Sequence, residues 1–274
     1  MKRSRRLMLG LLVAVAVPLA RAPAPRAQTP PFPPSSKVWV GRYAEYEAFL
    51  KTAPFQRVEG VSLGVTSPRH AFFAPGGLAA GAAWKPLKPG PYEGYFESYK
   101  SEIAAYKLDR MLELDMVPPT VERTYKAETG SLQLWIENTR MLKQILDAKV
   151  HAPDVEAWSV QVARQRAFDD LVADIDDNQG NQLVDRAWNL IKIDHSRAFT
   201  ATMTQPFEIG KTLNRIDRPF FDRMKALDRA SVDRELGPLL EARAAISLMA
   251  RRDAMVKAFQ KLAAAKGDAK VFTP

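Results

Sequence analysis

Cysteine is absent from the 274 residues of this chain, and histidine occurs only three times. The lack of cysteine excludes disulfide bonds, a thiolate nucleophile and a zinc site built on thiolates. It also makes the folded chain indifferent to the redox state of its compartment. The remaining composition is that of a globular protein, with 46% hydrophobic residues. A chain of this length buries a full core as one large domain or as two small ones.

Long apolar runs are scarce, and the clearest one lies near the N-terminus, over residues 7–20. It is short for a membrane-spanning helix, which needs about 20 residues, and Pro18 interrupts it. Basic residues precede the run and small residues with Ala-x-Ala spacing follow it, which is the order of an export signal. We therefore predict a signal peptide over residues 1–27 and a periplasmic or secreted protein. The alternative is an uncleaved membrane anchor. The pair Arg5 and Arg6 resembles a twin-arginine signal, which implies export after folding.

Much of the positive net charge of the chain lies in the predicted signal peptide. The whole chain has a formal net charge of +9 and a pI near 9.7, values that favour nucleic acid or a membrane surface as a partner. Residues 1–27 hold six basic side chains and no acidic one, so their removal lowers the charge to +3. We therefore expect no nucleic-acid partner, and no stable transmembrane span in the mature chain.

Past the signal, the sequence divides into a linker and two predicted lobes. Residues 28–38 are rich in proline, so we expect them to form an extended, semi-rigid linker. Strand and turn patterns dominate residues 39–137, which we predict to be a small antiparallel β lobe. Apolar residues at helical spacing dominate residues 138–274, which we predict to be a mainly helical C-terminal lobe.

A short amphipathic helix is predicted over residues 40–52, and we expect it to dock on the domain that begins near Pro54. An antiparallel three-stranded meander is expected next, with segments around Val58, Val65 and residues 71–73 separated by glycine and proline turns. Lys85 is placed at the end of the third strand.

A glycine-containing loop lies inside the meander, and it contains Gly64, Thr66 and Ser67. Backbone N–H groups and hydroxyls of this kind are suited to covering phosphates. A plain hairpin loop is the alternative interpretation of the same residues.

A helix is predicted over residues 98–112, because its apolar residues fall on one stripe and Glu102 lies in its first turns. In protein kinases a glutamate in such a helix pairs with a strand lysine, which here is Lys85. The alternative is a carboxylate that merely stabilises the N-terminus of the helix. Strands over residues 120–125 and 131–136 complete a predicted lobe of five strands and one helix.

The most informative stretch follows a helix predicted over residues 154–174. Residues 174–181 read DIDDNQGN, a composition that turns the chain rather than continuing the helix. Two short strands are then expected, over residues 182–184 and 188–193, and the second leads into Asp194.

The spacing within this stretch indicates chemistry. Asn181 follows Asp176 by five residues, and Asp194 lies across the predicted hairpin. In protein kinases an aspartate orients the acceptor hydroxyl, while an asparagine and an aspartate on a later strand hold Mg²⁺. Oxygen ligands of this type suit hard divalent cations whose coordination is completed by phosphate. The sequence therefore predicts a site for magnesium and phosphate.

Three segments carry a resemblance to a known family: EIAAYKLDRMLELDMVPPTV, GSLQLWIE and FDDLVADIDDNQGNQLVDRAWNLIKIDHSRAF. Together they resemble the atypical kinases that include HipA, the phosphoinositide-kinase catalytic domains and the secreted casein-kinase family. The resemblance covers residues 58–199. It implies an α+β, bilobal protein-kinase-like fold, with a small antiparallel β lobe and a mainly helical C-terminal lobe.

The same resemblance implies a role for each candidate residue. Lys85 and Glu102 would form the pair that contacts ATP, Asp176 would be the catalytic aspartate, and Asn181 and Asp194 would hold Mg²⁺ or Mn²⁺. The expected reaction moves the γ-phosphoryl group of ATP to a hydroxyl of a protein, a lipid or a small molecule.

The sequence also departs from the kinase pattern at two places. The last motif is Ile-Asp-His-Ser over residues 193–196 instead of Asp-Phe-Gly. Asp177 stands where relatives often have arginine. A pseudokinase that binds nucleotide without transferring phosphate is therefore the principal alternative.

A calcium-binding module is the third interpretation, because residues 174–185 imitate an EF-hand loop with oxygen ligands at its first, third, fifth and twelfth positions. The imitation fails at Gln179, where the loop requires glycine, and at Asn181, where an apolar residue is usual. A strand rather than a helix is also predicted to follow.

Overall fold

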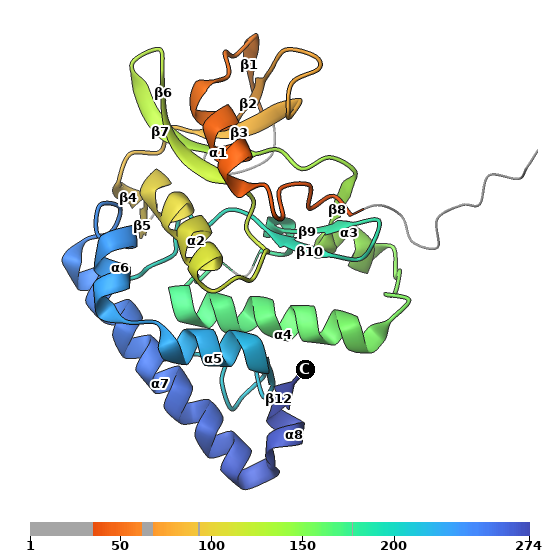
Figure 1. The fold of residues 1–274 in the computed structure, drawn as a ribbon, viewed down its shortest axis with the longest axis vertical. Coiled ribbons are helices and arrows are strands. Elements are labelled where there is room, and N and C mark those ends of the chain that lie inside the picture. Colours follow the sequence, from red (N-terminus) through yellow and green to blue (C-terminus); the bar gives the residue numbers. More distant parts are fainter. Residues whose placement is uncertain (1–34, 62–67, 93, 177) are drawn as a thin grey trace, which may run out of the picture. The chain divides into compact units, whose positions relative to one another are not determined.

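The computed structural model describes residues 35–61, 68–92, 94–176 and 178–274 (Figure 1). The predicted signal peptide and most of the predicted linker lie outside the described residues. So do Gly64, Val65, Thr66, Ser67 and Asp177. Among the described helices, none is both long enough and apolar enough to cross a membrane.

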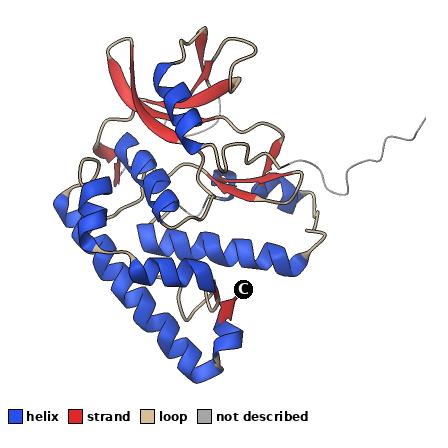
Figure 2. Ribbon diagram, viewed as in Figure 1, coloured by secondary structure: helices blue, strands red, loops and turns tan. Residues whose placement is uncertain are grey.

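Strands dominate the first part of the described chain and helices the last part (Figure 2). The strands are β1 (Arg57–Gly60), β2 (Arg69–Phe72), β3 (Gly81–Lys85), β4 (Gly90–Tyr92), β5 (Tyr95–Glu97), β6 (Thr120–Tyr125), β7 (Glu128–Leu134), β8 (Thr139–Met141), β9 (Gln182–Asp185), β10 (Leu190–Lys192), β11 (Ile216–Asp217) and β12 (Phe272–Thr273). The helices are α1 (Tyr43–Thr52), α2 (Tyr99–Met111), α3 (Leu142–Asp147), α4 (Val155–Val172), α5 (Arg218–Ala226), α6 (Arg229–Leu236), α7 (Ala242–Lys266) and α8 (Asp268–Val271).

The N-terminal sheet has five antiparallel strands in the order β1-β2-β3-β7-β6. Side chains alternate between the two faces of a strand, and Ala82 and Trp84 of β3 are buried in the same apolar cluster as Tyr46 and Leu50 of α1. Helix α1 therefore covers one face of the sheet. Lys85 belongs to the opposite face, because it follows Trp84 in the same strand.

The meander is confirmed as a set of three consecutive antiparallel strands, but its third strand was predicted in the wrong place. Residues 71–72 belong to β2, and the third strand is Gly81–Lys85. The sequence AAGAAWK over residues 79–85 consists mostly of small side chains, so its polar and apolar alternation is weak. Lys85 still ends the third strand, as predicted. The hairpin formed by β4 and β5 was not predicted.

Helix α2 begins where the sequence indicated, because the Ser98 hydroxyl accepts a hydrogen bond of 3.0 Å from the Lys100 N–H. The chain that leaves α2 is fixed by Asp109, whose carboxylate accepts hydrogen bonds from the N–H groups of Met116 and Val117 at 3.0 and 3.3 Å. Asp109 is fully buried. It therefore holds the connection between α2 and β6 at the cost of removing a carboxyl group from water.

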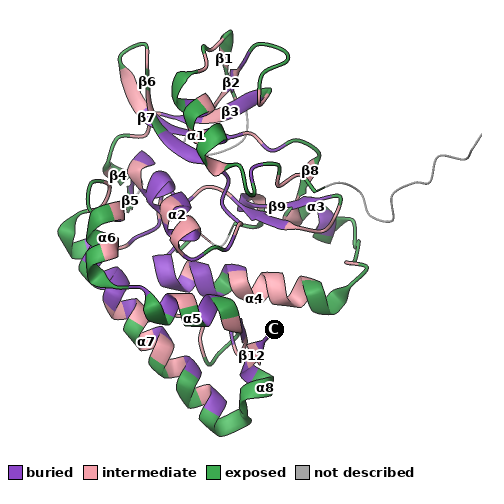
Figure 3. Cartoon of the chain, viewed as in Figure 1, coloured by how far each residue is buried: buried purple, intermediate pink, exposed green. Residues whose placement is uncertain are grey.

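The C-terminal lobe is organised around α4, which starts after the cap Asp154 and ends at Ala173 in the left-handed conformation. Both boundaries agree with the predicted helix to within two residues. The C-terminal half of α4 is buried, whereas its N-terminal turn is exposed (Figure 3). Phe168 and Leu171 of α4 share an apolar core with Phe220 of α5 and Phe259 of α7.

The predicted hairpin of β9 and β10 is confirmed, and β8 joins it as a third antiparallel strand. The polar loop between α4 and β9 is short, with one 3-10 turn over Gln179–Asn181. Two structural supports, α4 and the β9–β10 hairpin, thus hold this loop at its two ends.

The buried carboxyl group of Asp109 generates a prediction about stability and pH. Burial raises its pKa to about 7, whereas the same group in the unfolded chain ionises at about 3.9. Between these values the folded chain keeps a proton that the unfolded chain loses, so the contribution of this group to stability falls as pH rises. Asp109→Asn keeps an oxygen acceptor and removes the titration. We expect its free energy of unfolding, relative to wild type, to rise by roughly 2–4 kcal/mol between pH 4 and pH 8.

Urea unfolding at several pH values measures this difference, and Asp147→Asn on the exposed surface of α3 is the control. A difference between Asp109→Asn and wild type that does not change with pH would show that the carboxyl group is ionised throughout.

Candidate active site

The ammonium group of Lys85 lies between two carboxylates that come from different parts of the chain. Its Nζ is 2.6 Å from Glu102 Oε1 and 2.8 Å from Asp194 Oδ1. Burial alone would lower the pKa of Lys85, but the charges of Asp194 and Glu102 outweigh it and raise the pKa. Lys85 is therefore a buried cation at all physiological pH values.

Glu102 is buried in α2, and each of its two carboxylate oxygens has a partner. One oxygen binds Lys85, and the other accepts a hydrogen bond of 2.9 Å from the backbone N–H of His195. The carboxylate thus joins β3, α2 and the segment that follows β10. Lys85 and Glu102 therefore lie in contact, as the sequence resemblance to kinases led us to expect.

Asp194 follows the last strand residues in the left-handed conformation, with φ of 62°. Aspartate enters this region more readily than most other residues, because its short polar side chain makes local hydrogen bonds. Here the Ser196 hydroxyl donates to Asp194 Oδ1 at 3.2 Å. Burial alone would raise the pKa of Asp194, but the charge and hydrogen bond of Lys85 lower it to about 2. The carboxylate is therefore ionised.

Asp176 and Asn181 face each other across the polar loop. The Asn181 Nδ2 donates a hydrogen bond of 3.3 Å to Asp176 Oδ2, and the Asp176 N–H donates to Asp174 Oδ1 at 3.2 Å. Asn181 also accepts, through its backbone carbonyl, a hydrogen bond of 2.9 Å from the N–H of Ile193, the residue before Asp194. These contacts bring Asn181 to the end of the strand that carries Asp194. Asp176 is partly buried.

The donor set of this region fits a hard divalent cation. Asp194 supplies an ionised carboxylate that is 24% exposed, and Asn181 uses its amide N–H on Asp176, which leaves its amide oxygen for other partners. Mg²⁺ and Mn²⁺ prefer oxygen ligands of these two kinds. Asp194 and Asn181 are therefore the residues that would hold the metal.

Beneath this site lies a second buried lysine, which the sequence analysis did not single out. Lys192 is fully buried, and its Nζ is 3.5 Å from Asp169 Oδ2 and 3.4 Å from Asp174 Oδ2. It therefore ties the end of α4 and the start of the polar loop to β10, two residues before Asp194. The sequence does contain a signal for this buried lysine, because Lys192 lies inside the apolar run Leu-Ile-Lys-Ile, and lysine is almost never buried without a partner.

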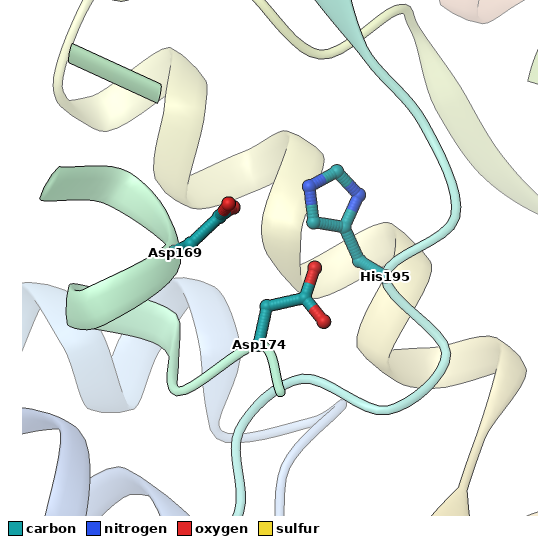
Figure 4. Close-up of side chains that lie close together, drawn as sticks. All are labelled: Asp169, Asp174 and His195. Carbon is teal, nitrogen blue, oxygen red and sulfur yellow. The ribbon is translucent and has the colours of Figure 1, made fainter. Parts of the chain in front are cut away.

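Asp169 and Asp174 also approach His195, as Figure 4 shows, and one ligand-type atom of each lies within 4.8 Å of the others. Groups of this composition hold metals in other proteins. In this chain the Lys192 ammonium already pairs with both carboxylates. Burial and the nearby lysine lower the pKa of His195, so the imidazole is neutral. The cluster is a structural ion network.

The two ends of the EF-hand-like loop are engaged with protein groups. Asp174 pairs with Lys192, and Asp185 accepts hydrogen bonds from the N–H groups of Ser36, Ala187 and Asn189 at 2.8 to 2.9 Å. A β strand, not a helix, forms at the C-terminal end of this stretch, because β9 occupies its last four residues. These contacts count against the calcium-binding interpretation.

Comparisons with known proteins place this geometry in a fold class. No protein-family model matches the chain, and no curated protein matches it either. Golgi casein kinase with Mn/ADP bound is similar at a TM-score of 0.61, with 14% identity over 84% of this chain and 78% of that one. A hydra Fam20 structure with sugar gives 0.62, with 16% identity over 84% and 92% of the two chains. The Helicobacter pylori proinflammatory kinase CtkA gives 0.50, with 11% identity over 81% and 94%.

These likenesses define the fold: the chain has a bilobal, kinase-like α+β fold, with an antiparallel sheet lobe followed by a mainly helical part. Within that class, the structures to which it is similar are atypical kinase-like folds, the group that the sequence resemblance indicated. At sequence identities of 11–16%, these structural similarities establish the fold of the chain.

Lys192 generates a prediction about stability. In Lys192→Met, Asp169 and Asp174 lose the buried cation that they share, and breaking a buried ion pair in this way costs roughly 3–5 kcal/mol. We expect the free energy of unfolding in urea to fall by that amount at pH 8. The loss should be smaller at pH 5, where protonation of the carboxylates relieves the charge.

Lys143→Met is the matched control, because Lys143 pairs with Asp147 on the surface of α3 at 61% exposure. Exposed pairs of this kind contribute less than about 0.5 kcal/mol. Equal losses in the two variants would contradict the structural role of Lys192.

Proposed function

We propose that this protein is an exported atypical kinase, which transfers the γ-phosphoryl group of ATP to a hydroxyl with the help of Mg²⁺ or Mn²⁺. The observation that carries the proposal is the contact of the buried Lys85 with Glu102 and with the partly exposed Asp194 in a kinase-like fold. These three residues come from β3, α2 and the end of β10, the positions at which kinases hold metal nucleotide.

The charges of the site suit nucleotide binding. Lys85 would contact the phosphates while Glu102 keeps its ammonium group in position, and Asp194 and Asn181 would hold the metal. A bound divalent cation neutralises phosphate charge. The Golgi casein kinase structure contains Mn/ADP, which supports this assignment. Gly64, Thr66 and Ser67 remain the proposed phosphate-covering loop.

Asp176 is proposed to act on the acceptor. In the transfer, the acceptor oxygen forms a bond to the γ-phosphorus, the bond from phosphorus to the bridging oxygen breaks, and ADP leaves. Asp176 orients the acceptor hydroxyl and receives its proton. The hydrogen bond from Asn181 would hold the carboxylate in one orientation, and the residue is only partly buried.

A pseudokinase has the same fold and the same nucleotide contacts without transfer. Asp177 favours this second candidate, because it adds a negative charge beside Asp176 where relatives often have arginine. Nucleotide binding without transfer in the wild-type protein would select it.

For the rest of the chain we propose a signal peptide over residues 1–27, a linker over 28–38, an N-terminal lobe over 39–137 and a C-terminal lobe over 138–274. Residues 135–138 connect β7 to β8 at the proposed lobe boundary. An exported kinase requires a source of ATP, because ATP is scarce outside the bacterial cytoplasm. The enzyme therefore needs a local phosphate donor or acts before export.

N-terminal sequencing of the protein from fractionated cells tests the export proposal. We expect a mature chain that begins near Gln28, because the basic, apolar and small-residue segments precede it in that order. Recovery of the intact chain with Met1 from the cytosol would contradict export.

The two proposed roles of the carboxylates generate a prediction that separates them. Metal nucleotide at 100 times its Kd should stabilise the fold by ~2.7 kcal/mol, which raises Tm by roughly 5–10 °C for a chain of this size. Asp194→Ala should lose this shift and phosphate transfer together. Asp176→Ala should keep most of the shift and lose transfer by roughly 10²–10⁴-fold.

Asp253→Ala, on the exposed side of α7, is the control and should change neither quantity. If Asp176→Ala transfers phosphate at the wild-type rate while Asp177→Ala does not, the catalytic role belongs to Asp177. A large rise in Tm with calcium alone, and no rise with metal nucleotide, would support the calcium-binding interpretation instead.

A further inference from the structure

A cavity of about 580 Å³ lies beside the proposed catalytic residues. Its lining comes from the β4–β5 hairpin, the start of α2, Ile175, residues 197–202, and the connection between α6 and α7 together with the start of α7. Sites that take small molecules have volumes of roughly 300–1,000 Å³. The cavity therefore has the size of a small-molecule site.

Two of the lining residues connect the cavity to the proposed chemistry. Ile175 immediately precedes Asp176 and is 39% exposed. Arg197 follows Asp194 by three residues. Burial alone would lower the pKa of Arg197, but Glu97 raises it, with a further contribution from the charge of Asp176. The cavity therefore borders the residue next to Asp176, although Asp176 itself does not line it.

The lining is chiefly apolar and aromatic. Tyr95 and Phe96 of β5 are 44% and 54% exposed, and Leu239 and Leu240 line the cavity from the connection between α6 and α7. Neighbouring aromatic side chains that remain exposed mark binding surfaces, because their burial by a partner is favourable. This lining suits a ligand with an apolar body.

The charged groups of the lining balance one another. The guanidinium of Arg197 pairs with Glu97 at 2.8 Å and lies over the ring of Tyr95 at 4.5 Å. The other charged side chains that line the cavity are Lys100 and Glu241, which have opposite signs. A strongly acidic or strongly basic peptide therefore finds no surplus of opposite charge among the described residues here.

The segment that forms one wall is held in place before any ligand binds. Arg251 of α7 is buried and donates hydrogen bonds to the carbonyls of Leu171 at 2.9 Å and Thr200 at 3.2 Å. The Ser247 hydroxyl donates to the carbonyl of Ala201 at 2.6 Å. Small-molecule sites are usually preformed in this manner.

We propose that this cavity binds the phosphoryl acceptor, and that the acceptor is a small alcohol with an apolar or aromatic body. The proposal rests on the kinase function proposed above, because it places the acceptor hydroxyl at Asp176. The hydroxyl oxygen would form the new bond to the γ-phosphorus as the bond to ADP breaks, and its proton would pass to the Asp176 carboxylate. The apolar body would contact Phe96 and the leucines across the cavity.

Naphthylmethanol, a fluorescent aromatic alcohol, is the probe for this site, titrated into the mature chain saturated with Mn²⁺ and a non-hydrolysable ATP analogue. Phe96→Ala removes an apolar wall, and Ile246→Ala on α7 is the matched control, because both side chains are 54% exposed and only Phe96 lines the cavity. We expect Phe96→Ala to weaken binding about tenfold, and Ile246→Ala to change the Kd less than about twofold. The nucleotide-induced Tm shift should be unchanged in both variants.

Glycerol and an acidic serine peptide serve as polar competitors, and neither should displace the probe. Absence of saturable probe binding, equal effects of the two variants, or displacement by glycerol or the peptide would overturn the inference. If metal nucleotide does not raise the Tm of the wild-type protein, this result would instead count against the kinase function. Transfer is measured separately with ATP in place of the analogue. Probe binding that depends on Phe96, without phosphate transfer to the probe from ATP, would keep the ligand site and count against the kinase function alone.

Discussion

The arrangement of the proposed active site depends on one buried ammonium group, that of Lys85. It is held between Glu102 and Asp194 at 2.6 and 2.8 Å, and these carboxylates come from α2 and from the end of β10. Opposite charges attract more strongly away from water, so this contact fixes the sheet lobe against the segment that carries Asp194. Because removing charged groups from water is costly, the lysine stabilises the folded chain only while both partners stay in place. The site is therefore ordered by the same charges that would bind metal nucleotide.

A second lysine has the same role one layer deeper, where no substrate reaches. Lys192 is fully buried between Asp169 and Asp174, whereas the side chain of Asp194 is 24% exposed. The deeper network ties the end of α4 and the start of the polar loop to β10, and the outer one leaves the Asp194 carboxylate partly exposed. This division explains why the cluster of Asp169, Asp174 and His195 is structural, although its residue types are those of metal sites.

The parts that the sequence predicted are those with strong local signals. The helix over residues 98–112, the helix that starts at Asp154 and the β9–β10 hairpin each have a cap, a turn or a clear period in the sequence. The third strand of the meander was misplaced because its small residues give no such period. The partners of Lys192 and the cavity beside Phe96 depend on contacts between distant segments, which no local pattern encodes.

The central claim is that Asp194 and Asn181 hold a metal nucleotide with Lys85 on its phosphates. A crystal structure grown with Mn²⁺ and a non-hydrolysable ATP analogue tests it most directly, because the anomalous signal of manganese locates the metal. We expect a manganese peak in contact with Asp194 and Asn181, and phosphate oxygens within hydrogen-bond distance of Lys85. A peak among Asp169, Asp174 and His195 with Lys192 displaced, or a nucleotide bound away from Lys85, would contradict the account.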